Sequence, residues 1–230
     1  ATDWDFDPHL EQRESYTATL TWWDSNEDGY EEHIFRRVRE TFYLDQHAHG
    51  WTSQTEDTRS IEIWRNSLHQ PHVLRIKVIG LTSWDNNSDG SSDTFNFLSR
   101  TWQGSDTNND GFLDRRVFHR HYMMQRDDNA DGNVAFSVNS NIWHARNLSL
   151  SASGTIEVLQ EAYLSHNVIL WNINSQGHAY HTNITWVGFQ IDYVAGTTQG
   201  ITVTAIIIDS NQDGTPESTN YTTAQNSTPP

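Results

Sequence analysis

The sequence predicts an all-β protein built as an antiparallel β-sandwich. Several segments alternate apolar and polar residues with a period of two, and they are rich in β-branched and aromatic side chains. Short segments rich in Asp, Asn and Gly separate them, as is typical of hairpin turns. The 230 residues include ten Trp, nine Phe and eight Tyr but no Cys. The core therefore depends on packed side chains and not on disulfides.

The expected strands follow one another along the chain. Four of them flank Asp-rich turns, at residues 17–23, 72–84, 133–138 and 200–208. Further strands are expected at residues 60–64, 154–159, 167–173 and 183–194. Residues 155–164 also fit a helical pattern, so strand and helix both stay open for that segment.

Five of the turns share the pattern Asp-x-Asn-x-Asp-Gly, and they begin at Asp24, Asp85, Asp106, Asp127 and Asp209. Composition alone would give roughly a hundredth of one such match in a chain of this length. Calcium binds six to eight oxygen atoms, and carboxylates crowded in a tight turn would repel one another without a cation. Glycine at position six supplies the sharp turn. The five segments therefore predict bound Ca²⁺.

The type of calcium loop follows from its last ligand. EF-hand loops need a Glu at position twelve, where none of the five segments has an acid. Four segments have an acid at position nine instead, and in this they resemble the D-x-[DN]-x-D-G-x-x-[DE] loops of FG-GAP (integrin-type) repeats. Thrombospondin type 3 repeats share part of the pattern but need cysteines that are missing here.

The resemblance implies a set of calcium ligands, with the fourth loop one ligand short because Ala135 stands at its position nine. The implied ligands are Asp24, Asn26, Asp28 and Glu32; Asp85, Asn87, Asp89 and Asp93; Asp106, Asn108, Asp110 and Asp114; Asp127, Asn129 and Asp131; and Asp209, Asn211, Asp213 and Glu217.

Each calcium loop is expected to be the turn of a β-hairpin. The middle three loops begin 21 residues apart, which leaves about one strand between them. In a meander the second and fourth loops would then lie at one end of the sheet and the third at the other.

We divide the chain into an arm (residues 1–8), a β domain with four calcium loops (9–150) and a region with the fifth loop and a polar tail (151–230). The last region is expected to be partly immunoglobulin-like. One continuous domain fits the same pattern.

The arm carries Trp4 and Phe6 on one face and three Asp residues on the other. An apolar terminus of this kind should dock, either on its own sheet or on a neighbouring subunit by β-strand addition. In its arrangement the second possibility resembles the donor strands of extracellular fibril subunits.

Five N-x-S/T sequons suggest a glycoprotein. The candidate sites are Asn147, Asn183, Asn220 and Asn226, whereas Asn86 lies inside a calcium loop and is the weakest.

Charge and motifs exclude several functions. The formal net charge of −16 argues against nucleic acid and anionic membranes as partners. No apolar run approaches the ~18 residues of a membrane helix. The chain begins at Ala1 without a signal segment, from which we expect a processed, secreted or cell-surface protein.

Catalytic motifs are absent, and we expect no enzyme, although the paired carboxylates of a glycosidase stay open. His47 with His49 and His119 with His121 have the spacing of transition-metal ligands, but structural or solvated His is the better interpretation.

The leading expectation is a structural subunit of an extracellular fibre, stabilised by Ca²⁺, glycosylated and self-assembled through the arm. The alternative is a carbohydrate-binding or adhesion module of a larger secreted protein, with glycans as partners.

Overall fold

The computed structural model describes residues 12–44, 53–85, 87, 92–128 and 131–228. These residues form eleven strands. The strands are β1 (Gln12–Trp23), β2 (His33–Leu44), β3 (Ser53–Arg65), β4 (Pro71–Trp84), β5 (Thr94–Ser105), β6 (Arg115–Arg126), β7 (Phe136–Leu150), β8 (Ile156–Ile173), β9 (Ala179–Asp192), β10 (Thr197–Ile208) and β11 (Ser218–Thr228).

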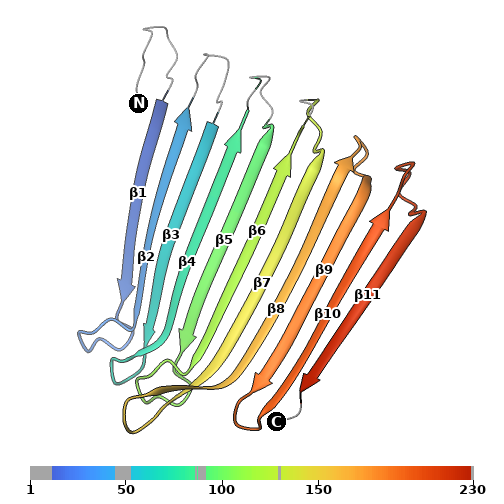
Figure 1. Cartoon of the computed structure of the whole chain (residues 1–230). Coiled ribbons are helices and arrows are strands. Elements are labelled where there is room, and N and C mark those ends of the chain that lie inside the picture. Colours follow the sequence, from blue (N-terminus) through green and yellow to red (C-terminus); the bar gives the residue numbers. More distant parts are fainter. Residues whose placement is uncertain (1–11, 45–52, 86, 88–91, 129–130, 229–230) are drawn as a thin grey trace.

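All eleven strands join one antiparallel sheet in which spatial order equals sequence order, β1 to β11 (Figure 1). The all-β prediction is confirmed. Residues 155–164, for which a helix had stayed open, lie almost wholly in β8. The described residues include no helix long and apolar enough to cross a membrane.

The described strands form one open sheet, so the two packed layers of the expected sandwich, and its immunoglobulin-like part, are not seen among them. The reason lies in the connections. Neighbouring strands are joined by short turns, and a short turn returns the chain to the adjacent position in the same sheet. Period-two alternation indicated strands correctly, but it does not say how many layers they form.

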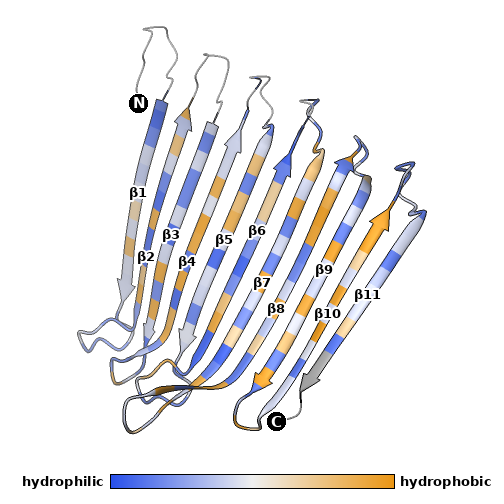
Figure 2. Ribbon diagram, viewed as in Figure 1, coloured by the Kyte–Doolittle hydropathy of each residue, from blue (hydrophilic) through white to orange (hydrophobic). Residues whose placement is uncertain are grey.

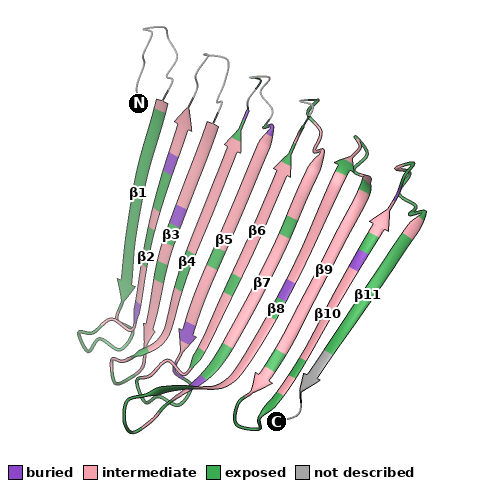
Figure 3. Cartoon of the chain, in the orientation of Figure 1, coloured by how far each residue is buried: buried purple, intermediate pink, exposed green. Residues whose placement is uncertain are grey.

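A single layer buries few side chains. Among the described residues only Leu148 and Ala205 are buried apolar residues, and most strand residues are half-buried (Figure 3). Apolar bands lie across many strands (Figure 2). The chain exposes 14007 Å², whereas a compact monomer of 26.5 kDa would expose about 10,700 Å². This excess is what an isolated layer without a cover produces.

The hairpin prediction is confirmed at all five Asp-rich loops, because each is closed by the strand residues directly beside it. The closing pairs are Trp23–His33, Trp84–Thr94, Ser105–Arg115, Arg126–Phe136 and Ile208–Ser218. The second and fourth loops share one end of the sheet and the third lies at the other, as predicted. The fifth loop lies with the second and fourth, and the first lies with the third.

Three other turns, at residues 66–70, 151–155 and 174–178, were not predicted as turns of one kind. In each, the backbone N–H of the first residue donates to the carbonyl of the fifth, at 2.9 Å. A side-chain oxygen of the first residue (Asn66, Ser151 or Asn174) accepts from the fifth residue's N–H at 2.9–3.0 Å. These Asx- and Ser-based turns need no ion.

The structure shows where the expected polar tail and the expected boundary near residue 150 lie in the sheet. Residues 218–228, expected as a polar tail, form β11 by pairing with β10. The boundary expected near residue 150 falls in the hairpin turn between β7 and β8, which pair along most of their length. The arm and its residues Trp4 and Phe6 lie outside the described residues.

Candidate metal centres and a candidate binding face

The first, third and fifth Asp-rich loops share one hydrogen-bonded framework. One carboxylate oxygen at position one accepts from the glycine N–H at position six, at 2.7–2.8 Å. The other oxygen accepts from the N–H at position five, at 3.2–3.3 Å. The Asn oxygen at position three accepts from that same N–H, at 3.0–3.1 Å. The side chains at positions one and three are therefore fixed from inside the loop.

Backbone conformation explains the glycine. Gly29, Gly111 and Gly214 have φ of 88–90°, and Gly132 in the fourth loop has 83°. A side chain at these angles would be strained. The fourth loop has the same glycine conformation although Ala135 stands at its position nine.

The acid at position nine folds back toward position two. Glu32 Oε2 accepts from Ser25 N at 2.6 Å, and Glu217 Oε2 accepts from Ser210 N at 2.6 Å. The other Glu32 oxygen, Oε1, is buried and has no hydrogen-bond partner. A buried carboxylate oxygen without a partner fits a cation ligand, because leaving it unpaired costs free energy.

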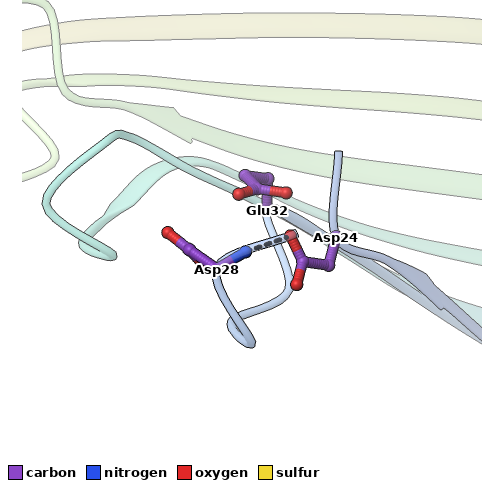
Figure 4. A group of neighbouring side chains, drawn as sticks. All are labelled: Asp24, Asp28 and Glu32. Carbon is purple, nitrogen blue, oxygen red and sulfur yellow. Dashed lines mark hydrogen bonds between the residues drawn. The ribbon is translucent and has the colours of Figure 1, made fainter. Parts of the chain in front are cut away.

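The first loop brings three carboxylates together. Asp24, Asp28 and Glu32 each offer an oxygen, and these oxygens lie within 4.8 Å of one another (Figure 4). A hydrogen bond from Asp28 N to Asp24 Oδ1 links two of them, and the three carboxylates are not bonded to one another. Three anions at this spacing repel one another unless a proton or a cation intervenes, and an all-oxygen set suits Ca²⁺.

Burial strengthens the same interpretation in other loops. The side chain at position one is buried in three of them: Asp106 is 0 % exposed, Asp209 5 % and Asp85 7 %. Asp93, at position nine of the second loop, is 6 % exposed. Withdrawing a carboxylate from water is costly unless hydrogen bonds or a metal compensate.

The second and fourth loops are described only in part, since Asp89 and Asn129 lie outside the described residues. In the fourth, Asp127 Oδ2 accepts from Gly132 N at 2.7 Å and Asp131 Oδ1 from Asn133 N at 2.9 Å. Ala135 stands at position nine and uses its N–H to bond Arg126 O. The described part of this loop keeps these hydrogen bonds although position nine has no carboxylate.

Side chains of neighbouring turns contact two of these loops. Tyr30 of the first loop stacks on His69, with ring centroids 4.2 Å apart. His178 Nδ1 lies 3.0 Å from Gln212 O in the fifth loop. The first and fifth loops are thus each in contact with a neighbouring turn at their end of the sheet.

The remaining predicted sites are scattered. Asn147 and Asn220 are exposed in β7 and β11, Asn183 is half-buried in β9, and Asn226 lies in β11. His119 and His121 share one face of β6, as predicted. They belong to no group of three metal-binding side chains among the described residues. His47 and His49 lie outside the described residues.

Register reveals a feature that the sequence reasoning missed. Five aromatic side chains occupy directly paired positions on five consecutive strands and so lie on one face of the sheet. This aromatic row consists of Trp102, Phe118, His144, Tyr163 and Phe189. All five side chains are half-buried. At ~4.8 Å per strand, the row spans about 19 Å.

A glycine makes room for the first member of the row. A Cβ at Gly104 would come within 2.9 Å of Trp102 Cη2 and of Leu113 Cδ1. The indole therefore extends along its own strand over the Gly104 backbone.

Arginines flank the row on the same face. Arg100 pairs with Arg120 two residues to one side, and Arg116 pairs with Arg146 two residues to the other. Arg146 binds Glu161 at 2.9 Å, whereas neither Arg100 nor Arg120 forms an ion pair with a described acid. Arg120 Nε is buried without a hydrogen-bond partner. Like charges directly opposite each other destabilise a sheet.

Glu161 contacts the row, because its Oε1 lies 2.5 Å from Nε2 of His144. Partial burial raises its pKa, but hydrogen bonds from Arg146, His144 and Tyr193 outweigh burial, so the pKa of Glu161 lies below its ordinary value. The carboxylate is thus held ionised.

Comparison of the chain with protein-family models, with curated proteins and with solved structures finds no match. Function must therefore be argued from the loops, the sheet edges and the aromatic row.

Proposed function

We propose that the chain is a calcium-stabilised, glycosylated structural subunit of an extracellular or cell-surface fibre, assembled through its N-terminal segment. Calcium acts by neutralising loop acids and locking hairpins, without chemistry on a substrate. Five Ca²⁺ ions would bring the formal charge from −16 to about −6.

The two sheet edges carry this proposal. Edge strands β1 and β11 have 12 and 11 residues and are mostly exposed (Figure 3). Natural proteins commonly protect edges with Lys, Pro, bulges or short strands. Neither strand contains Lys or Pro, and β11 contains no charged residue.

Open edges favour addition of another strand. Because β1 and β11 are different surfaces, their contact between copies would be head-to-tail and would continue into a filament. The arm, with Trp4 and Phe6, immediately precedes β1 in the sequence and is the segment proposed to dock on the neighbouring copy.

Negative-stain electron microscopy tests the proposal. In calcium we expect filaments from the intact chain and single particles from a version without residues 1–8. Thr19→Lys and Thr223→Lys, which charge the two edges, should also shorten or abolish filaments. Ser153→Lys, in an exposed turn, is the matched control. Monodisperse particles from the intact chain would end the fibre proposal.

A second candidate function is a carbohydrate-binding module, and the aromatic row favours it. Apolar C–H faces of sugar rings stack on flat aromatic rings, and a row of such rings suits an extended glycan. Retention of the monomeric protein by a panel of polysaccharides tests this function separately from filament formation.

A further inference from the structure

We propose that the aromatic row and the Arg100–Arg120 pair form one binding site for an anionic polysaccharide, a glycan that carries carboxylate or sulfate groups. This inference rests on the second proposed function and adds the residues of the site and the charge of the ligand.

Basic residues are concentrated in the middle strands of the sheet. Strands β4 to β7 contain eight of the chain's 14 Lys and Arg residues and no Asp or Glu. The acids that make the whole chain negative are concentrated in the loops at the strand ends and in other strands. Five of the eight share the face of the aromatic row, so this face is locally basic in a protein of net charge −16; they are Arg100, Arg116, Arg120, Arg126 and Arg146.

Arg100 and Arg120 form no ion pair with a described acid. Arg100 and Arg120 face each other across β5 and β6. At a cross-strand Cβ separation of about 4.5–5.5 Å, two guanidinium groups disfavour the sheet. An anion held by both groups would turn this repulsion into attraction, because guanidinium binds carboxylate and similar oxyanions through two parallel hydrogen bonds. The orphan Arg120 Nε is a donor of the required kind.

The aromatic rings lie beside this arginine pair. Trp102 and Phe118 lie two residues from Arg100 and Arg120 on the same strands and the same face. A sugar ring stacked on Trp102 or Phe118 would therefore place its charged substituent near the arginine pair. Tyr122, on the other side of Arg120, lies with its ring 5.9 Å from that guanidinium.

The distribution of charge favours a polysaccharide over nucleic acid as the ligand. DNA carries one charge per ≈ 1.7 Å and needs a long basic track. Here the basic surface is bounded by acidic loops at both ends of the sheet, which would repel a dense polyphosphate. A polysaccharide carries its charges farther apart and presents ring faces between them, which matches isolated arginines beside a row of rings.

Affinity gel electrophoresis and calorimetry in calcium provide the test. The probes are hyaluronan (carboxylate), dextran sulfate (sulfate), dextran (neutral) and single-stranded DNA. We expect binding to one or both anionic glycans and none to dextran. Whichever of hyaluronan and dextran sulfate binds more tightly identifies the anion that the arginines select. Circular dichroism and thermal unfolding verify that each variant is folded.

Matched variants locate the site. We expect Arg100→Gln with Arg120→Gln to weaken glycan binding at least tenfold, and Trp102→Ala with Phe118→Ala to weaken it similarly. Arg37→Gln with Lys77→Gln removes the same charge from exposed positions on the opposite face and should change affinity less than twofold.

Four outcomes would overturn the inference. Equal losses in the two charge variants would show attraction without a site. Binding to DNA as tight as to glycans, unchanged by Trp102→Ala with Phe118→Ala, would show ion exchange. Dextran binding as tight as that of the anionic glycans would remove the charge selectivity but leave the binding module standing, whereas no retention by any glycan would remove both.

Discussion

At the scale of single residues, the structure buries acids that a bound cation would stabilise. Asp106 is fully buried and already accepts two backbone hydrogen bonds. Its charge strengthens those bonds but repels Asp110 and Asp114. The sign of its contribution to stability should therefore depend on calcium.

Asp106→Asn tests this dependence. We expect the variant to be less stable than the parent in calcium, by about 1–3 kcal/mol, and equally or more stable in excess chelator, where removing one charge relieves repulsion. Thermal unfolding in both conditions measures the difference. Asp128→Asn, at an exposed position two of the fourth loop, is the control. A loss of stability that is the same with and without calcium would contradict the metal assignment.

Glu161 gives a pH-dependent prediction. Its folded pKa lies below the ordinary value of 4.5, so the folded state binds fewer protons and gains stability above that pH. This gain is lost as pH falls from about 4.5 through the folded pKa. We expect Glu161→Gln to cost about 0.5–1.5 kcal/mol at pH 7 and to match the parent below the folded pKa. Urea unfolding across pH measures the gap.

At the scale of elements, the fourth loop resembles a calcium loop with one ligand missing. Its backbone already has the glycine turn and the bonds to Asp127 and Asp131. Ala135→Asp should restore the ninth ligand and raise the melting temperature in calcium by a few degrees. Ala135→Asn, which adds a similar side chain without charge, is the control. An equal effect of both substitutions, or a gain that persists in chelator, would count against the ligand role.

Within β5, Gly104 and Gly80 of the neighbouring β4 form a matched pair. A Cβ at Gly104 would meet Trp102 and Leu113 at 2.9 Å, whereas one at Gly80 would meet nothing within 4 Å. We expect Gly104→Ala to cost about 1–3 kcal/mol by displacing the indole and Gly80→Ala to be neutral or stabilising. Chemical denaturation measures both. Equal effects would mean that the indole does not depend on Gly104.

The sequence predicts the strands and hairpins, and it also implies part of the register between them. Strands and hairpins were predictable because alternation is a local property and the Asp-rich loops mark the turns. Each of these nine-residue loops is flanked by its closing pair, so the register was implied as well. Counting outward from the third loop places Trp102 opposite Phe118. Counting outward from the fourth loop likewise places Phe118 opposite His144. A register shift between Asn147 and Leu148 interrupts the count into β8, so Tyr163 and Phe189 could not be aligned with the other three from the turns alone.

At the scale of the whole molecule, the number of layers could not be predicted. Segments such as residues 72–84 alternate two partly apolar faces, and this pattern fits a sandwich or a single sheet that a partner covers. Which applies depends on long-range packing, which alternation does not encode. The candidate calcium ligands come from the motif, and the Arg100–Arg120 pair follows from the same count that places Trp102 opposite Phe118. That Arg120 Nε is buried without a hydrogen-bond partner depends on packing, which alternation does not encode.

Chelation should affect the whole sheet, because the five loops lie at both of its ends. We expect excess EDTA to lower the melting temperature strongly and added calcium to restore it, since ligands that bind only the folded state stabilise it by mass action. Extracellular calcium modules bind at about 10⁻⁴–10⁻³ M, so the midpoint should fall in that range. An unchanged melting temperature in EDTA would remove the calcium proposal.

The order of the strands has a consequence for how the chain folds. Every pairing joins strands that are neighbours in sequence, from β1 with β2 to β10 with β11. No distant segment must arrive before a strand can pair, so each step closes only a short loop and its entropy cost is small. The sheet can therefore grow outward from any hairpin, and a chain that emerges from its N-terminus can add strands in the order of their synthesis. Calcium bound on the way would secure the five hairpins that have Asp-rich loops, whereas the Asx- and Ser-based turns would close without an ion.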